Sequence, residues 1–337
     1  EAGTTGEAGQ AGSGGVDGSG GAWSNAGMDG GAGADGGAGD GGSDGMGEAM
    51  LKGPIVRGSK CVLEFGDLYF EVDAAVAGRI SSARVGRDEL LIGPAVHETN
   101  YGSTFWTSPQ ADWSWPPVVD IDSAAFSVSA EGTSCTLVGP RVDLRDTPAV
   151  HQLRLSKKFS ADLLNDAVEV EYTLRNEGRD TKRLAPWEIT RVPPYGLTFF
   201  ATDSAPSGSV VPPVTREHGC VWFKYEDSVR HHAKLYADGK GWIAHVTTDD
   251  LLLIKTFPDL EPGQAAEGEA EIEVYASNPP GAPSARYVEV ENQGAFTELR
   301  PGAALTWSVR WYLRKLPRGL TATPSAALLA FVQRTVE

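Results

Sequence analysis

From Lys52 onward the chain consists of short apolar runs separated by turn residues. The runs are rich in Val, Ile, Tyr, Phe and Thr, and Gly, Asn, Asp or Pro interrupts them roughly every 8 to 12 residues. In residues 168–174 apolar and polar positions alternate almost strictly, which indicates a strand with one buried and one wet face. This pattern predicts an all-β fold built as one large antiparallel β-sandwich. We expect strands at 61–65, 68–72, 124–130, 150–159, 167–175, 183–191, 220–225, 241–246, 251–257, 270–275, 286–291 and 304–313.

One long segment, residues 93–119, does not fit the strand pattern. Pro94, Pro109, Pro116 and Pro117 cannot donate hydrogen bonds to a ladder, so we expect no strand there. Irregular segments of this length inside a domain are usually functional.

The two ends of the chain differ from the strand-rich part. At the C-terminus apolar residues fall at helical spacing from Ala326 to Val336, which predicts a short helix with Thr323 as a candidate N-cap. Residues 1–48 contain no Lys or Arg, eight acidic residues and many glycines, so they cannot bury enough apolar surface to offset the entropy of ordering. We therefore divide the chain into a disordered Gly-rich arm (1–48), a sandwich domain (49–320) and a C-terminal helix packed on it (321–337).

Charge and hydropathy limit the partners. The formal net charge is −16, and no basic stripe of the kind that binds nucleic acid is present, so we expect no nucleic-acid partner. The longest apolar runs have strand length, and any membrane attachment is expected only through a lipid anchor ahead of Glu1. The chain begins without Met, which suggests a removed targeting segment and hence an exported protein, periplasmic, extracellular or tethered to the cell surface. We expect a monomer.

The three cysteines, Cys61, Cys135 and Cys220, leave two alternatives open. They can form one disulfide with one thiol left over, or all three can serve as small buried hydrophobic residues. No Cys or His grouping has metal-ligand spacing, so we expect neither a metal nor a cofactor.

Three segments are distinguished by their motifs rather than by periodicity. One is a candidate hairpin, one a loop rich in Gly, Trp and Pro, and one a strand followed by a Pro-Gly turn and a long last strand. They read Gly78-Arg79-Ile80 with Glu89-Leu90-Leu91, then residues 101–109, then residues 287–293 with Leu299-Arg300-Pro301-Gly302 and residues 307–313.

In this order the segments resemble the galactose-mutarotase-like superfamily, which includes aldose 1-epimerases and sandwich domains of polysaccharide-degrading enzymes. The resemblance spans roughly residues 55–315. Its closest form is a bacterial secreted family of unassigned function with the loop pattern Trp-x-x-Pro-(Glu/Gln)-x-x-Trp-x-(Trp)-Pro-Pro, matched here by residues 106–117. The resemblance implies a mutarotase-like supersandwich with carbohydrate as the partner.

The chain departs from the superfamily at one position that carries chemistry. Mutarotases use a His as general acid and a second His beside the sugar, one of them in a His-Pro-Tyr-Phe-like segment. The corresponding segment here is Pro186 to Arg191, which puts Glu188 or Arg191 in the His position. Glu188 could replace the acid only with a raised pKa. Arg191 could instead clamp an anionic sugar, and the two residues lie on opposite faces of a regular strand.

The resemblance also places a catalytic carboxylate in the closing segment. Glu289 and Glu291 are two residues apart on a predicted strand, so both project from one face, which we expect to be solvent or a pocket. Either this is an ordinary wet face, or Glu291 is a general base supported by Glu289.

The Trp-rich loop offers the binding groups. Trp106, Trp113 and Trp115 could stack on sugar rings beside Asp112, or the loop could simply plug one end of the sandwich. In an extended loop Trp113 and Trp115 would share a side and Asp112 would point away.

Two further residues complete the candidate site. Arg79 could act with Arg191 as a clamp for anions or hydroxyl groups, and His97 is the histidine whose loop position favours function. The other histidines, His231 and His232 on an expected edge strand and His245 on a central strand, are expected to be structural.

Three interpretations follow from these residues. The first is a carbohydrate-active protein with its site on the concave sheet face, an epimerase or lyase that uses Glu291. The alternative is a surface-tethered glycan-binding protein without catalysis. A structural envelope protein, with the Trp loop as packing alone, is the third interpretation.

Overall fold

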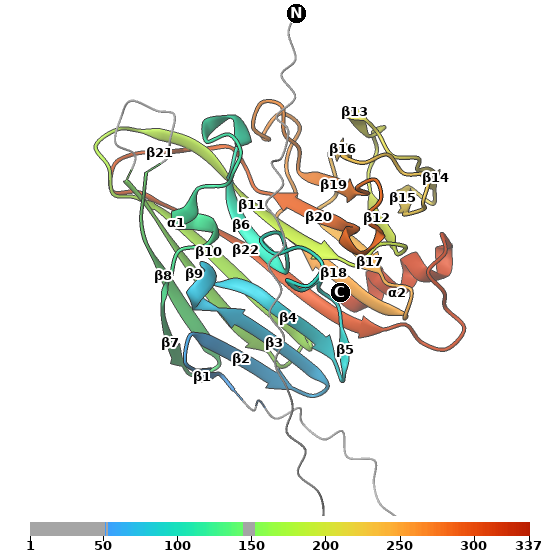
Figure 1. Ribbon diagram of the computed structural model, residues 1–337, viewed down its shortest axis with the longest axis horizontal. Helices are drawn as coiled ribbons and strands as arrows, with labels where there is room; N and C mark the ends of the chain where they lie inside the picture. The colour runs from blue at the N-terminus through green and yellow to red at the C-terminus, as the bar shows by residue number, and fades with distance from the viewer. Residues whose placement is uncertain (1–50, 52, 144–151) are drawn as a thin grey trace, which may run out of the picture. The chain divides into compact units, whose positions relative to one another are not determined.

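The computed structural model describes residue 51, residues 53–143 and residues 152–337. In this part of the chain two antiparallel sheets pack face to face (Figure 1). These residues lie within one unit, Glu48–Glu337. The prediction of an all-β, antiparallel sandwich with a short C-terminal helix is confirmed. The predicted arm, residues 1–48, lies outside the described residues.

In the described part of the chain the larger sheet contains twelve strands. Ten follow one path in the order β1-β2-β3-β4-β6-β11-β20-β19-β16-β13, while β5 pairs with β4 and β21 pairs with β11. The strands are β1 (Ile55–Arg57), β2 (Lys60–Phe65), β3 (Leu68–Asp73), β4 (Arg79–Val85), β5 (Asp88–Glu89), β6 (Ser103–Ser108), β11 (Lys182–Val192), β13 (Ser207–Val210), β16 (Ala233–Ala237), β19 (Ile272–Ser277), β20 (Tyr287–Gln293) and β21 (Thr297–Leu299).

Among the residues that the structure describes, the smaller sheet contains ten strands in the order β14-β15-β12-β17-β18-β22-β10-β9-β8-β7. The long strand β22 pairs with β10 on one side and with β18 on the other. The strands are β7 (Ser127–Glu131), β8 (Ser134–Asp143), β9 (Gln152–Asp162), β10 (Ala167–Asn176), β12 (Leu197–Ala201), β14 (Thr215–Glu217), β15 (Cys220–Lys224), β17 (Trp242–Val246), β18 (Leu251–Thr256) and β22 (Ala304–Lys315).

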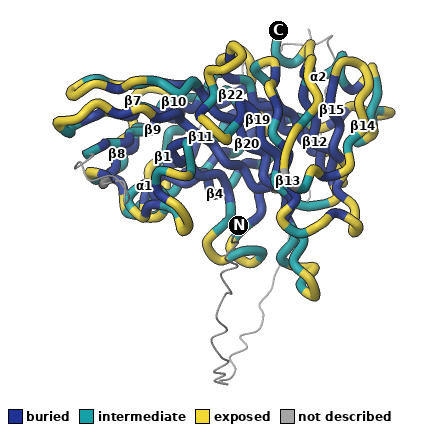
Figure 2. Tube along the Cα trace, turned by 90° about the horizontal axis from the view of Figure 1, so that it is seen from above, coloured by how far each residue is buried: buried dark blue, intermediate teal, exposed yellow. Residues whose placement is uncertain are grey.

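Alternating residues of the smaller sheet supply two separate cores. One set, which includes Phe200 and Leu253, packs between the sheets, whereas the neighbouring set, which includes Phe199 and Leu252, packs on the outer face. In Figure 2 the tube is buried through β19 and β20 and exposed along the turns near β7 and β14.

The helix α2 (Ala326–Val336) covers the outer core of the smaller sheet through the buried residues Leu328 and Val332. Its N-cap is Ser325, whose side chain accepts a hydrogen bond from the backbone N–H of Leu328 at 3.2 Å, so the assignment of Thr323 as cap was wrong. The remaining helices are single turns, and none of the helices in the described part of the chain could span a membrane. They are η1 (Ala74–Val76), η2 (Gln110–Asp112), α1 (Val119–Asp122) and η3 (Pro283–Ala285).

The expectation that residues 93–119 contain no strand was wrong. Residues 103–108 form β6, a central strand of the larger sheet between β4 and β11. The prolines flank this strand instead of interrupting it, because Pro94 precedes it and Pro109 follows it, so every ladder donor of β6 is retained.

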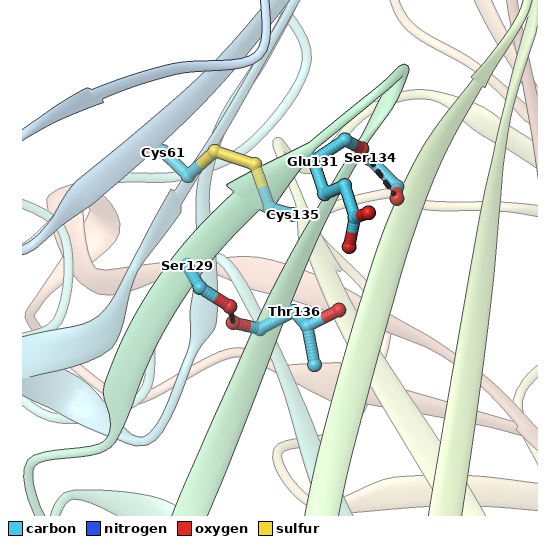
Figure 3. Close-up of a disulfide and its surroundings, with 6 residues drawn as sticks. All are labelled: Cys61, Ser129, Glu131, Ser134, Cys135 and Thr136. Atoms are coloured by element: carbon cyan, nitrogen blue, oxygen red, sulfur yellow. Dashed lines mark hydrogen bonds between the residues drawn. A yellow bond between two sulfur atoms is a disulfide. The ribbon is translucent and has the colours of Figure 1, made fainter.

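A disulfide joins the two sheets. Cys61 on β2 bonds to Cys135 on β8, 74 residues away in the sequence, with the two Cα atoms 6.5 Å apart (Figure 3). Cys220 is a buried free thiol whose pKa burial raises to about 11. Of the two alternatives for the cysteines, one disulfide with one thiol left over is therefore correct.

Candidate functional site

A row of polar side chains crosses the outer face of the larger sheet, the face that points away from the smaller sheet. Arg191 on β11 lies directly opposite Glu289 on β20, and Glu289 lies opposite Tyr275 on β19. Tyr275 in turn lies opposite Lys234 on β16. Because directly paired residues of adjacent strands project to the same side, these four side chains form one row across the sheet.

A second row runs beside the first. Ile189 lies opposite Glu291, Glu291 opposite Glu273, and Glu273 opposite Tyr236. Glu291 is fully buried and Glu289 is only 9% exposed. The two carboxylates were expected on a face open to solvent or to a pocket. In the structure they are instead covered and paired with cations.

Arg191 anchors one end of this cluster. Its Nε donates to Glu289 Oε1 at 2.8 Å and its Nη1 donates to Thr104 Oγ1 at 3.1 Å. Its guanidinium carbon lies 5.3 Å from the centre of the Trp106 ring. The side chain is fully buried, yet Nη2 has no hydrogen-bond partner among the described residues. A buried guanidinium N–H without an acceptor is costly, so this atom is available to a ligand oxygen.

Glu291 lies at the centre of the cluster. Its Oε2 accepts a hydrogen bond from Trp187 Nε1 at 3.0 Å and one from Lys234 Nζ at 3.2 Å. Its Oε1 is buried, and no partner for it occurs in the described part of the chain. Burial raises the pKa of Glu291 to about 7, and the nearby Glu289 adds to this shift while Lys234 opposes it. A carboxyl group that titrates near neutrality can accept a proton from a ligand.

Lys234 connects two carboxylates across three strands. Its Nζ lies 2.6 Å from Glu273 Oε2 and 3.2 Å from Glu291 Oε2. Burial alone would lower the pKa of Lys234, but the two carboxylates raise it well above its usual value. Burial also raises the pKa of Glu273, against the effect of Lys234. The lysine therefore stays charged and holds the two acidic side chains together.

Each of the two candidate carboxylates reaches Trp106 through one intervening side chain. The Arg191 guanidinium lies over Trp106 and bonds to Glu289. The Trp187 ring centre lies 5.5 Å from that of Trp106, and its N–H bonds to Glu291. Glu289, Glu291 and Trp106 thus belong to one cluster.

The other two tryptophans of the loop have different surroundings. Trp113 is buried, donates to the carbonyl of Thr107 at 2.8 Å and packs edge-on against Trp106. Trp115 is 59% exposed and packs on Trp106 with ring centres 6.1 Å apart. The extended loop on which Trp113 and Trp115 would share a side does not occur, because η2 and the positive φ of Ser114 turn the chain between them.

Asp112, in η2, is half-buried. Burial lowers the pKa of Lys182, at the start of β11, and the negative charge of Asp112 opposes this shift. Arg191 lies near the opposite end of that strand. The structure therefore does not bring Asp112 to the carboxylates of β20.

His97 borders the same cluster. Its ring meets the ring of Tyr287 edge-on with centres 5.9 Å apart, and its Nδ1 accepts the backbone N–H of Asn100 at 3.0 Å. Nδ1 is therefore unprotonated in the neutral ring, which leaves the proton on Nε2. Burial and the charge of Arg191 lower the pKa of His97, while Glu289 acts in the opposite direction. His97 is thus a neutral donor beside the site.

Two further histidines, His231 and His232, lie at the other end of the first row. His232 Nδ1 lies 2.6 Å from the hydroxyl of Tyr275, and the rings of His231 and His232 lie 3.6 Å apart between centres. They were expected on an edge strand, but they precede β16 in a turn where His232 has a φ of 61°. They border the face that carries Glu289.

Arg79 supports the site without reaching the carboxylates. It donates to the backbone oxygens of Thr99 and Tyr101 and pairs with Asp122 at 3.3 Å. Asp122 in turn accepts the N–H of Trp106 at 2.9 Å. Since these contacts hold the segment that follows His97, the structure favours a positioning role over the expected clamp.

Glu188 does not belong to this cluster, which corrects its place among the candidate catalytic residues. It projects between the two sheets, is fully buried, and accepts hydrogen bonds from Tyr172 and from Trp311 Nε1. Its Oε1 lies 3.3 Å from Lys255 Nζ. The physical reason is the period of two along β11, which sends Glu188 to the face opposite Arg191.

Four residues of the cluster were not found from the sequence: Trp187, Lys234, Glu273 and Tyr275. Lys234 and Tyr236 alternate with apolar residues on β16, as do Glu273 and Tyr275 on β19, so the wet face was visible. That this face lies next to β20 depends on the order of the strands in the sheet, which the alternation of polar and apolar residues does not reveal. Within the described residues no group of three or more His, Cys, Asp or Glu side chains is placed to hold a metal ion.

Comparison with known proteins places the fold. The sequence matches no known family model and no curated protein. The structure is similar to a galactose mutarotase-like protein from Lactobacillus casei, with 11% identity, a TM-score of 0.56 and coverage of 76% of this chain and 100% of that one. A galactose mutarotase related enzyme from Lactobacillus acidophilus gives 10% identity, a TM-score of 0.53 and coverage of 79% and 100%.

A third similar structure is a TPR-domain containing protein from Parabacteroides distasonis, with 13% identity and a TM-score of 0.54; the match covers 79% of this chain and 49% of that one. The chain therefore has the galactose-mutarotase-like fold that the sequence predicted. At these identities the likeness concerns the fold, and the chemistry depends on the residues of the site.

Proposed function

We propose that this protein binds a sugar on the outer face of the larger sheet and that Glu291 removes a proton from the sugar's anomeric hydroxyl. The observation that carries the proposal is the free Oε1 of Glu291, a buried carboxylate oxygen without a partner among the described residues. A general base works best when its pKa lies near the operating pH, and the pKa of Glu291 is about 7.

The reaction class that fits these groups is ring-opening epimerisation. Glu291 takes the proton of the anomeric hydroxyl, the bond between the anomeric carbon and the ring oxygen breaks, and that proton passes through water to the ring oxygen, which also accepts a hydrogen bond from His97 Nε2–H. The open-chain aldehyde then closes on its other face by the reverse of these steps, and Glu291 ends as the carboxylate it was at the start. Arg191 Nη2 donates a hydrogen bond to a sugar oxygen during these steps.

The charges around the site favour an uncharged sugar. Arg191 lies on the site face, the position from which it could clamp an anionic sugar, but its Nε is paired with Glu289. Lys234 is likewise paired with Glu273 and Glu291. Because each cation already faces a carboxylate, an acidic ligand would meet no unpaired positive charge.

Binding without catalysis is the second candidate function. Arg191 and Glu291 are fully buried, whereas Trp115 is 59% exposed and packs on Trp106. A sugar that stacks on Trp115 and hydrogen-bonds to the partly exposed Glu289 and Lys234 would need no contact with Glu291.

An exported location is also part of the proposal. Disulfides persist in oxidising compartments, and the Cys61–Cys135 disulfide is buried and links the two sheets. This supports a protein that works outside the cytosol.

The test is NMR of the protein with glucose, galactose and mannose. Saturation-transfer measurements report binding, and exchange spectroscopy reports interconversion of the anomers. We expect binding and anomeric exchange above the buffer rate, with exchange lost in Glu291→Gln and retained in the surface control Glu131→Gln. Binding without exchange would leave the non-catalytic function, and no binding to any of the three sugars would contradict both.

A further inference from the structure

Aromatic and cationic side chains extend the candidate site across five neighbouring strands of the larger sheet. The Trp115 and Trp106 ring centres lie 6.1 Å apart, and those of Trp106 and Trp187 lie 5.5 Å apart. Lys234 Nζ then lies 5.0 Å from the centre of the Trp187 ring and 5.5 Å from that of Tyr236. From β6 to β16 this row covers four strand spacings of about 4.8 Å, about 19 Å in all. A single pyranose ring occupies only a fraction of that length.

A cavity of about 300 Å³ continues the row beyond Tyr236. Tyr236 forms part of its wall, and Ser207 on the edge strand β13, which is paired with Tyr236, forms another part. The loop between β18 and β19 supplies the opposite wall. The volume falls at the lower end of the range for ligand pockets, so it can hold a small ring.

The turn that precedes Trp115 also contacts the wall of the cavity. Glu269, on the wall of the cavity, accepts the backbone N–H of Gln110 at 2.8 Å. Gln110 begins the single turn that leads to Trp115. The Trp-rich loop and the wall of the cavity are therefore in direct contact.

From this arrangement we infer that the ligand is an oligosaccharide, with one ring at the Trp106 and Glu291 cluster and the next rings directed over Tyr236 into the cavity. The inference rests on the proposed sugar-binding function and names its ligand class. Because proton removal by Glu291 requires a free anomeric hydroxyl, the ring at the cluster is the reducing end. The chain then leaves that ring through another hydroxyl and runs toward β13.

The cavity wall restricts the chemistry of the bound rings. Its charged members are acidic, Asp238, Glu261, Glu269 and Glu271, and neither Lys nor Arg occurs among the described residues that line it. Carboxylates accept hydrogen bonds from sugar hydroxyls, but they repel carboxylate or sulfate groups. The oligosaccharide is therefore free of acidic groups.

The experiment compares ligands of increasing length by isothermal titration calorimetry. The probes are glucose, cellobiose, cellotriose and cellotetraose, a second series from N-acetylglucosamine to its tetramer, and trigalacturonate as the acidic control. Two variants fill the cavity, Ala205→Trp and Ala265→Trp, each at a small residue of its wall. Ala130→Trp, at an exposed position on β7, is the matched control.

We expect affinity in one neutral series to rise about tenfold with at least one added ring, a step of about 1.4 kcal/mol. Both cavity variants should lose this gain while their affinity for the monosaccharide stays unchanged, and Ala130→Trp should behave as the wild type. Equal affinity for monomer and tetramer would overturn the inference and leave sugar binding intact. A length dependence that survives both cavity variants, or tighter binding of trigalacturonate, would overturn it as well. Absence of binding to every probe would reject the proposed function itself.

Discussion

Glu291 and Glu273 lie directly opposite each other on adjacent strands, and Lys234 Nζ contacts a carboxylate oxygen of each, at 3.2 and 2.6 Å. Like charges placed opposite each other in a sheet repel. The lysine offsets this repulsion, and it is the group that allows a carboxyl with a pKa near 7 to exist on a covered sheet face.

Removal of this lysine should destabilise the fold. In Lys234→Met two carboxyls face each other in a covered site without a cation, so we expect a loss of about 3 kcal/mol in the free energy of unfolding. The double variant Lys234→Met/Glu273→Gln removes the repulsion and should recover most of the loss. Denaturant unfolding at pH 7 measures both values. A single variant as stable as the wild type would show that the lysine does not hold the cluster together.

The raised pKa of Glu291 predicts how stability depends on pH. Because its pKa in the folded state is about 7, above the unfolded value of 4.5, its contribution is fully present below about pH 4.5 and is lost as the pH rises through 7. The wild type should therefore lose up to about 3 kcal/mol from this group between these pH values. Glu291→Gln, which cannot titrate, should lack this component in unfolding curves measured from pH 4.5 to 8. Parallel curves for the two proteins would contradict the burial of an ionisable carboxyl at this position.

Glu188 is expected to be structural. It pairs with Lys255 between the sheets, where both side chains are fully buried. Glu188→Gln should lower the free energy of unfolding by about 3 kcal/mol, because Lys255 then keeps a buried charge without its counterion. The double variant Glu188→Gln/Lys255→Met should regain stability and bind sugar as the wild type does. A folded Glu188→Gln protein with normal stability but no anomeric exchange would instead return Glu188 to the list of catalytic groups.

The disulfide should contribute strongly to stability. It closes a chain segment of 74 residues, for which loop-closure entropy predicts about 4 kcal/mol. We expect the double variant Cys61→Ala/Cys135→Ala to unfold at a correspondingly lower guanidinium concentration. Cys220 is a suitable internal control, since its buried thiol should react with iodoacetamide only after unfolding.

More of the fold than of the site could be predicted from the sequence. The alternation in residues such as Val168 to Leu174 depends only on which faces are wet, and β10 is found where it predicts. The same period of two placed Glu289 and Glu291 on one side and Glu188 opposite Arg191, as the structure has them. The partners of these residues were not predictable. Lys234 reaches Glu291 only because β16 lies two strands from β20, and strand order is decided by long-range packing.

In the Trp-rich loop too, the kind of side chain could be predicted from the sequence, whereas its position could not. Its composition indicated stacking groups, but of the three candidate tryptophans the structure exposes only Trp115. Which ring faces solvent is decided by the turn at Ser114, a non-glycine residue with a φ of 56°. Residue spacing in the sequence does not predict this backbone conformation.

Trp115 and Trp113 should therefore respond differently to the same substitution. Trp115 is 59% exposed, so Trp115→Ala should leave the free energy of unfolding within about 0.5 kcal/mol of the wild type and should weaken sugar binding, because the stacking surface is lost. Trp113 is 2% exposed and donates to the Thr107 carbonyl, so Trp113→Ala should cost about 3 kcal/mol or more of stability through the cavity it leaves. Thermal unfolding and titration calorimetry on the two variants separate the effects. If Trp115→Ala binds sugar as tightly as the wild type, the ring takes no part in binding and the loop serves packing alone.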